Sequence, residues 1–133
     1  MAEDRSDLLI GVWKLIEIVN TDEAGNALRS SYGARKMGLI TFNDDHRMMV
    51  VISDGRDSIL EGTDREYSSY TGRYTFDGTT LKTEVDGSLP IERVGTLQTR
   101  PARLEGKRIT LTAPPVEIDG VVNYRDLTWE RIE

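Results

Sequence analysis

The chain has 133 residues, a formal net charge of −6 and no cysteine, so it fits one domain over residues 1–133 without disulfides, cysteine-based zinc sites or a thiol nucleophile. The acidic balance argues against nucleic acid as the main partner, because phosphate binding needs a concentrated basic surface. The acidic start and the lack of any run of ~20 apolar residues predict neither signal peptide nor membrane span, so we expect a cytoplasmic protein.

The chain is predicted to be all-β. Residues 4–9 are expected to form one short helical turn, capped by Ser6 or Asp7. After it, apolar residues recur with a period of two between frequent turn signals, which predicts strands. The expected strands cover residues 12–19, 37–42, 47–53, 67–76, 80–86, 96–104, 108–112 and 121–132. Their short connections predict antiparallel pairing, and the charged segment 54–66 is expected to be a mobile connection or lid.

The strongest long-range signal joins the first strand to the last. Gly11 and Trp13 open the first strand, and Arg131 lies near the end of the last. We expect the Arg131 guanidinium to stack over the Trp13 indole as a cation–π contact, in preference to a role of this pair in ligand recognition. A sheet whose two ends meet is a barrel, so the pair predicts a small closed barrel that is sealed at this end.

Side-chain alternation predicts which residues face the barrel interior. In the strand 96–104, alternation places Gln98 and Arg100 inside, unless Pro101 marks a bulge that shifts the register. The first strand is apolar on both faces, and we place Glu17 on its inward face. The predicted ligand-lining residues are Leu15, Glu17, Val50, Tyr70, Tyr74, Leu81, Thr83, Gln98, Arg100 and Leu111.

Six short motifs carry a resemblance to a known family. They are Gly11-Val-Trp13-Lys-Leu15, Gly38-Leu-Ile-Thr-Phe42, Tyr70-Thr-Gly72-Arg-Tyr74, Gly95-x-x-Gln98-x-Arg100, Leu104-Glu-Gly106 and Leu127-Thr-Trp129-Glu-Arg131. Over nearly the whole chain, this order resembles the bacterial and fungal lipocalin-like domain family, one of the calycin β-barrels. The resemblance implies an antiparallel up-and-down barrel of about eight strands, with Trp13 packed near Arg131. It implies little about function, because such barrels serve both carriers and enzymes. The family pattern also places a histidine where Thr83 stands.

Three functional hypotheses follow from the inward residues. The first is a carrier or sensor module that binds a small apolar or amphipathic molecule, with Arg100 or Gln98 as polar anchor. The second is a cofactor-free isomerase, cyclase or dehydratase for a carbonyl-containing apolar substrate. In it, Glu17 moves a proton while Arg100 and a tyrosine stabilise the oxyanion. The third, and least favoured, is a filled barrel that binds another protein through its surface.

The same residues also have structural interpretations. A buried ion pair between Glu17 and Arg100 that holds the barrel in register is as consistent with the sequence as a ligand site. Of Tyr70 and Tyr74, one is expected in the core and the other in the site. An internal cavity on the order of 300 Å³ or more would support both ligand hypotheses. A solvent-facing Glu17 would exclude the enzymatic one.

The only histidine, His46, lies in a predicted turn, so we expect it at the surface. A Ser–His–Asp triad would have to use this residue, and the sequence contains no Gly-x-Ser-x-Gly elbow and no glycine-rich nucleotide-binding loop. We therefore predict no metal and no cofactor. The expected partner is a small molecule, and the oligomeric state is left open, with a homodimer as one candidate.

Overall fold

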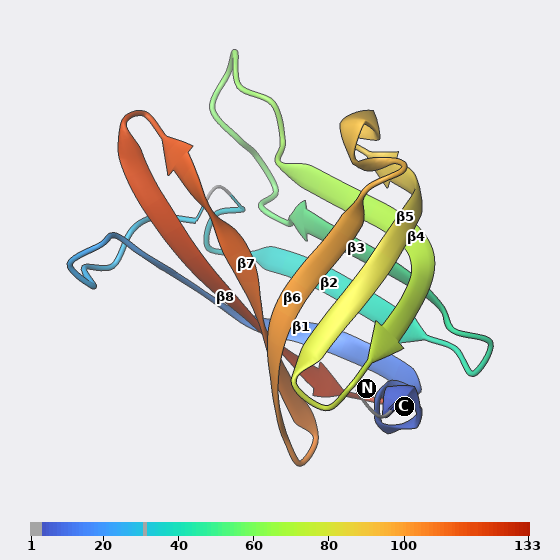
Figure 1. Ribbon diagram of the computed structural model, residues 1–133. Coiled ribbons are helices and arrows are strands. Elements are labelled where there is room, and N and C mark those ends of the chain that lie inside the picture. The colour runs from blue at the N-terminus through green and yellow to red at the C-terminus, as the bar shows by residue number, and fades with distance from the viewer. Residues whose placement is uncertain (1–3, 31) are drawn as a thin grey trace.

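The eight strands of the protein form a closed antiparallel barrel (Figure 1). The computed structural model describes residues 4–30 and 32–133. Each strand pairs with its neighbours in sequence, and the last returns to the first. The strands are β1 Gly11–Thr21, β2 Lys36–Phe42, β3 Arg47–Asp54, β4 Tyr67–Phe76, β5 Thr80–Leu89, β6 Leu97–Glu105, β7 Arg108–Ile118 and β8 Val121–Arg131; two 3₁₀ turns are η1 Ser6–Leu9 and η2 Ile91–Arg93. The predicted all-β, up-and-down barrel of about eight strands is confirmed.

One end of the barrel is sealed by η1 and by the start of β1. The Trp13 indole is fully buried and donates a hydrogen bond of 2.9 Å to the carbonyl of Leu9 in η1. The Arg131 guanidinium carbon lies 4.7 Å from the centroid of the Trp13 ring, and the same guanidinium donates to the Leu8 carbonyl. Since Trp13 and Arg131 are also register partners, this contact joins β1 to β8 and ties η1 to both strands.

The expected capping of the N-terminal turn is wrong in detail. The turn begins after Arg5, and neither Ser6 nor Asp7 caps it. Instead, the Asp4 carboxylate accepts hydrogen bonds from the backbone N–H and the hydroxyl of Ser6, at 3.0 and 2.6 Å. These bonds hold the pKa of Asp4 at about 2. The acceptor thus lies two residues before Ser6, outside the turn.

We predict that Arg131→Met destabilises the protein by about 1–3 kcal/mol, because it removes a cation–π contact and a hydrogen bond while keeping an aliphatic stem. Urea unfolding measures the change. The matched control is Arg108→Met, since Arg108 is exposed and pairs only with Glu130 at the surface. Its expected cost is below about 1 kcal/mol. Equal costs for the two variants would show that Arg131 contributes no more than a surface arginine.

Strands β6 and β7 pair over only part of their length. These two strands pair only from Ala102 to Glu105 on β6 and from Arg108 to Leu111 on β7. The first half of β6 pairs with β5, and the second half of β7 is paired in the described structure only with β8, so the two strands diverge (Figure 1). Prolines suit such an edge because they cannot donate a ladder hydrogen bond. Pro101 lies where β6 changes partner, and a bulge brackets Pro114 and Pro115 on β7.

Candidate ligand-binding site

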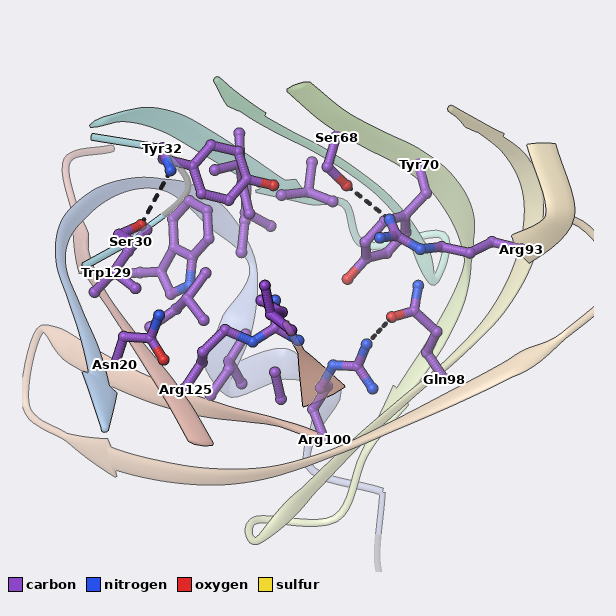
Figure 2. Close-up of a pocket in the computed structure, with 18 residues that line it drawn as sticks. Asn20, Ser30, Tyr32, Ser68, Tyr70, Arg93, Gln98, Arg100, Arg125 and Trp129 are labelled. Carbon is purple, nitrogen blue, oxygen red and sulfur yellow. Dashed lines mark hydrogen bonds between the residues drawn. The ribbon is translucent and has the colours of Figure 1, made fainter. Parts of the chain in front are cut away.

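The barrel contains a cavity of about 120 Å³ (Figure 2). Its wall includes Asn20 on β1 and Arg125 on β8, which are register partners far along these strands from Trp13 and Arg131. The cavity therefore lies toward the end opposite the seal. Its apolar and aromatic lining consists of Ile18, Tyr32, Ile40, Val50, Ile52, Tyr70, Leu111, Ala113, Ile118, Leu127 and Trp129. The polar lining consists of Asn20, Ser30, Ser68, Arg93, Gln98, Arg100 and Arg125.

The cavity is smaller than the 300 Å³ or more expected from the sequence. Large side chains account for the difference, because three aromatic residues and three arginines extend into this half of the barrel. The other half is filled by a packed core. That core includes Leu9, Trp13, Leu15, Phe42, Met48, Tyr74, Phe76, Leu81 and Ile109, each at most 4% exposed. The interior is thus divided into a solid half near η1 and a hollow half near η2.

Five of the predicted lining residues lie in the cavity wall: Val50, Tyr70, Gln98, Arg100 and Leu111. The placement of Leu15, Tyr74, Leu81 and Thr83 in this wall is wrong, because all four are buried in the packed half. The Tyr74 hydroxyl donates to the Asn43 carbonyl at 2.9 Å, and the Thr83 hydroxyl contacts the Met48 sulfur at 3.2 Å. Of the two tyrosines, Tyr74 is therefore the core residue and Tyr70 the cavity residue.

The inward placement of Glu17 is also wrong. Leu15 pairs with Trp129 and Glu17 with Thr128, so Ile16 is an extra residue in the ladder between β1 and β8. This bulge reverses the alternation beyond it. Glu17 is consequently exposed, whereas Ile18 and Asn20 line the cavity in its place.

The exposed position of Glu17 excludes two of the predicted arrangements. On the outer face of β1, this carboxylate neither pairs with Arg100 nor moves protons inside the barrel. The enzymatic hypothesis required that carboxylate, and no aspartate or glutamate among the described residues that line the cavity takes its place.

Arg100 faces the cavity from β6, and alternation continues through Pro101 without a shift. Its guanidinium donates to the side-chain oxygen of Gln98 and, at 3.2 Å, to the carbonyl of Thr99. Burial lowers the pKa of Arg100; Tyr70 raises it, and the neighbouring charges of Arg93 and Arg125 lower it. The guanidinium is therefore a half-buried cation with two other positive charges nearby.

Arg93 and Arg125 were not predicted as site residues. Arg93 reaches the cavity from η2, where it donates to the Ser68 hydroxyl at 2.7 Å and stacks 5.7 Å from the centroid of the Tyr70 ring. Arg125 enters from β8, and one of its terminal nitrogens lies 3.5 Å from the Pro114 carbonyl. The sequence held a signal for Arg125, which shares an alternating face with Leu127 and Trp129. The sequence contained no such pattern for Arg93, because the position of this residue depends on the path of a loop.

Several polar atoms of the cavity wall are buried without a hydrogen-bond partner. They are the side-chain oxygen of Asn20, the side-chain nitrogen of Gln98, Nε of Arg125 and the indole nitrogen of Trp129. Buried polar groups in native proteins almost always have partners, so these four atoms leave unused hydrogen-bonding capacity on residues of one cavity wall. Three of the four are donors.

Two tyrosines add neutral hydroxyls to the wall. Burial raises the pKa of Tyr70, against a smaller opposite effect of Arg100 and Arg93. Burial likewise raises the pKa of Tyr32, as does the charge of Glu66. Both phenols therefore stay protonated at neutral pH and are able to donate hydrogen bonds.

A family model described as a lipocalin-like domain matches residues 10–132. The chain belongs to this lipocalin-like family. The resemblance drawn from six sequence motifs is thereby confirmed. A search of curated proteins and a search of solved structures each gave no significant match. A lipocalin-like barrel supports a binding role in general terms and leaves the ligand to be argued from the cavity itself.

The single histidine lies outside the cavity of this lipocalin-like barrel. His46 lies in the β2–β3 turn with a φ of 65°, and its Nε2 is 3.2 Å from an Asp4 carboxylate oxygen. Within the described residues, no group of three or more His, Asp or Glu side chains is arranged to hold a metal ion. No helix in the same part of the chain has both the length and the apolar composition needed to cross a membrane.

The predicted lid, residues 54–66, is anchored at both ends in this lipocalin-like barrel. Asp54 is 1% exposed, and its carboxylate accepts hydrogen bonds from the Arg56 guanidinium, which lowers the pKa of Asp54 to about 2. At the other end, Arg65 donates to the carbonyls of Asp54 and Arg56. These bonds fix where the segment leaves β3 and returns toward β4.

Proposed function

We propose that this protein binds a small amphipathic molecule in the hollow half of its barrel. The observation that carries the proposal is a cavity with an apolar wall and a cluster of unpartnered polar atoms. Ligand sites characteristically combine mostly apolar walls with a few placed polar groups. The apolar part of the ligand would contact Ile40, Val50 and Trp129, and its polar part would meet Gln98 and Arg100.

The volume limits the size of the buried group. The cavity has a volume of about 120 Å³. Apolar cavities of about 150 Å³ hold a benzene ring. The enclosed part of the ligand is thus the size of a single ring, and any longer substituent would extend out of the cavity.

The other hypotheses are less well supported. The enzymatic one lacks its proton-transfer group, since Glu17 is exposed. A filled barrel that acts only through its surface does not account for a cavity with four unpartnered polar atoms. The lack of cysteine suits a reducing compartment, so the proposed binding is placed in the cytoplasm.

A thermal-shift panel of ring-sized compounds tests the proposal. Benzylamine, benzyl alcohol, benzamide and benzoate cover the three charge states, and acetamide, which lacks the ring, is the control. A compound present at 100 times its Kd stabilises the fold by about 2.7 kcal/mol, so at least one ring compound is expected to raise Tm in a saturable way. If none shifts Tm more than acetamide does at millimolar concentration, the proposal is wrong.

A further inference from the structure

Three arginines from three separate elements converge on the cavity. Arg93 comes from η2, Arg100 from β6 and Arg125 from β8, and Figure 2 shows Arg100 and Arg125 pointing into the space from below while Arg93 reaches it from the side of Tyr70. None of the three forms a salt bridge with any described residue, and the described lining contains no aspartate or glutamate.

In the described structure, carboxylate partners occur for some arginines of the chain, but for none of the three in the cavity. Acidic residues outnumber basic ones in the chain, 23 to 17. Five arginines elsewhere have a carboxylate partner, in the pairs Arg35–Asp57, Arg47–Asp86, Arg56–Asp54, Arg103–Glu105 and Arg108–Glu130. Carboxylates thus pair with five arginines elsewhere on the protein, whereas the described cavity wall offers its three arginines only neutral partners.

We infer that the occupant of the cavity is an organic anion, whose oxyanion head binds Arg100 and Arg125 and whose ring-sized apolar body packs against Trp129. The inference rests on the proposed binding function and specifies the class of ligand. A guanidinium presents two parallel N–H donors that match a carboxylate or a phosphate. Arg125 Nε and the Trp129 indole nitrogen, both buried and unpartnered, supply further donors beside that head.

Electrostatics support the same ligand class. Like charges disfavour one another when they are buried, and the pKa of Arg100 is lowered by burial, Arg93 and Arg125. All three arginines are half-buried, and a charge that is partly removed from water gains from a nearby opposite charge. A bound anion supplies the missing counter-charge for all three guanidinium groups, whereas a neutral or cationic ligand would leave them unpaired.

Titration calorimetry of the full chain with four probes at neutral pH tests the inference. Benzoate and phenyl phosphate carry an oxyanion head on a ring, benzamide carries the ring without charge, and inorganic phosphate carries the head without the ring. We expect benzoate or phenyl phosphate to bind at least 10-fold more tightly than both benzamide and inorganic phosphate. The tighter of the two ring anions identifies the head as carboxylate or phosphate.

Variants locate the effect in the cavity. Arg100→Gln and Arg125→Gln are each expected to weaken binding of the better ring anion at least 10-fold and to leave benzamide binding unchanged. The matched control is Arg103→Gln, on the same strand as Arg100 but 71% exposed, which is expected to change neither. Removal of a half-buried charge that has no acidic partner and like charges nearby is also expected to leave Tm of the unliganded protein unchanged or higher, so lost binding will not reflect unfolding.

The outcomes distinguish failure of the anion inference from failure of the proposed binding function. Two results would contradict the anion specificity without contradicting the binding function. In one, benzamide binds as tightly as both ring anions. In the other, Arg103→Gln weakens anion binding as much as Arg100→Gln does. If no ring probe binds at all, both proposals fall. A drop in Tm for both cavity variants without ligand would instead show that the arginines hold the barrel together, and would overturn the inference.

Discussion

Val50→Phe is expected to abolish binding of every ring-sized probe while the barrel stays folded. Val50 is 3% exposed and lies in the cavity wall, next to Tyr70 in the register of β3 and β4. A phenylalanine ring at this position occupies space that is empty in the wild type, so it displaces the ligand and does not overpack the core. Cavity filling of this kind is expected to change the free energy of unfolding by no more than about 1 kcal/mol, or to raise it.

The control for that variant is one residue away. Val51 follows Val50 on β3 but faces outward and is 42% exposed. Val51→Phe adds the same ring outside the barrel and is expected to bind benzoate and benzamide as the wild type does. Calorimetric titration of the two variants and the wild type provides the comparison. Wild-type affinity in folded Val50→Phe would place the ligand elsewhere on the protein.

Leu81→Ala is expected to destabilise the protein by about 4–5 kcal/mol, and Leu111→Ala by only about 2–3 kcal/mol. Both leucines are buried, but Leu81 is 1% exposed within the packed half, whereas Leu111 is 7% exposed and borders the cavity. The cost of a Leu→Ala change includes a term for the new cavity. At Leu111 the deleted atoms only enlarge a space that already opens to water.

Urea unfolding of the two leucine variants measures this difference directly. The pair is matched in chemistry, so a difference in free energy reports the surroundings of each side chain. Costs that agree within about 0.5 kcal/mol would mean that the interior is uniformly packed. Leu111→Ala is also expected to enlarge the cavity. The variant should therefore bind a larger ring compound, such as 2-naphthoate, more tightly than the wild type does.

The strands were predictable because each is a local pattern between strong turn signals. Asp77-Gly78 is an example: Gly78 adopts a φ of 102°, which suits glycine, and the hairpin joins β4 to β5 as expected. The barrel closure was predictable as well, because it depends on two residues, Trp13 and Arg131, that stand near the ends of the first and last strands.

The site was only partly predictable, because it depends on pairings between distant strands. The bulge at Ile16 arises where β1 meets β8, and since both faces of β1 are apolar, alternation gave no warning that Glu17 would face outward. Gln98 and Arg100 were placed correctly because β6 alternates without a bulge. Arg93 was missed because η2 is a loop turn, whose direction no periodic pattern encodes.

The most direct test of a ligand inside the barrel uses the two tryptophans of the chain as internal reporters. The indole nitrogen of Trp129 is buried and unpartnered at the cavity, whereas that of Trp13 is bonded to Leu9 in the sealed end. In a ¹H–¹⁵N spectrum, titration with benzoate is predicted to shift the Trp129 indole signal saturably and to leave that of Trp13 in place. Two unmoved signals, or two that move alike, would contradict binding in the hollow half.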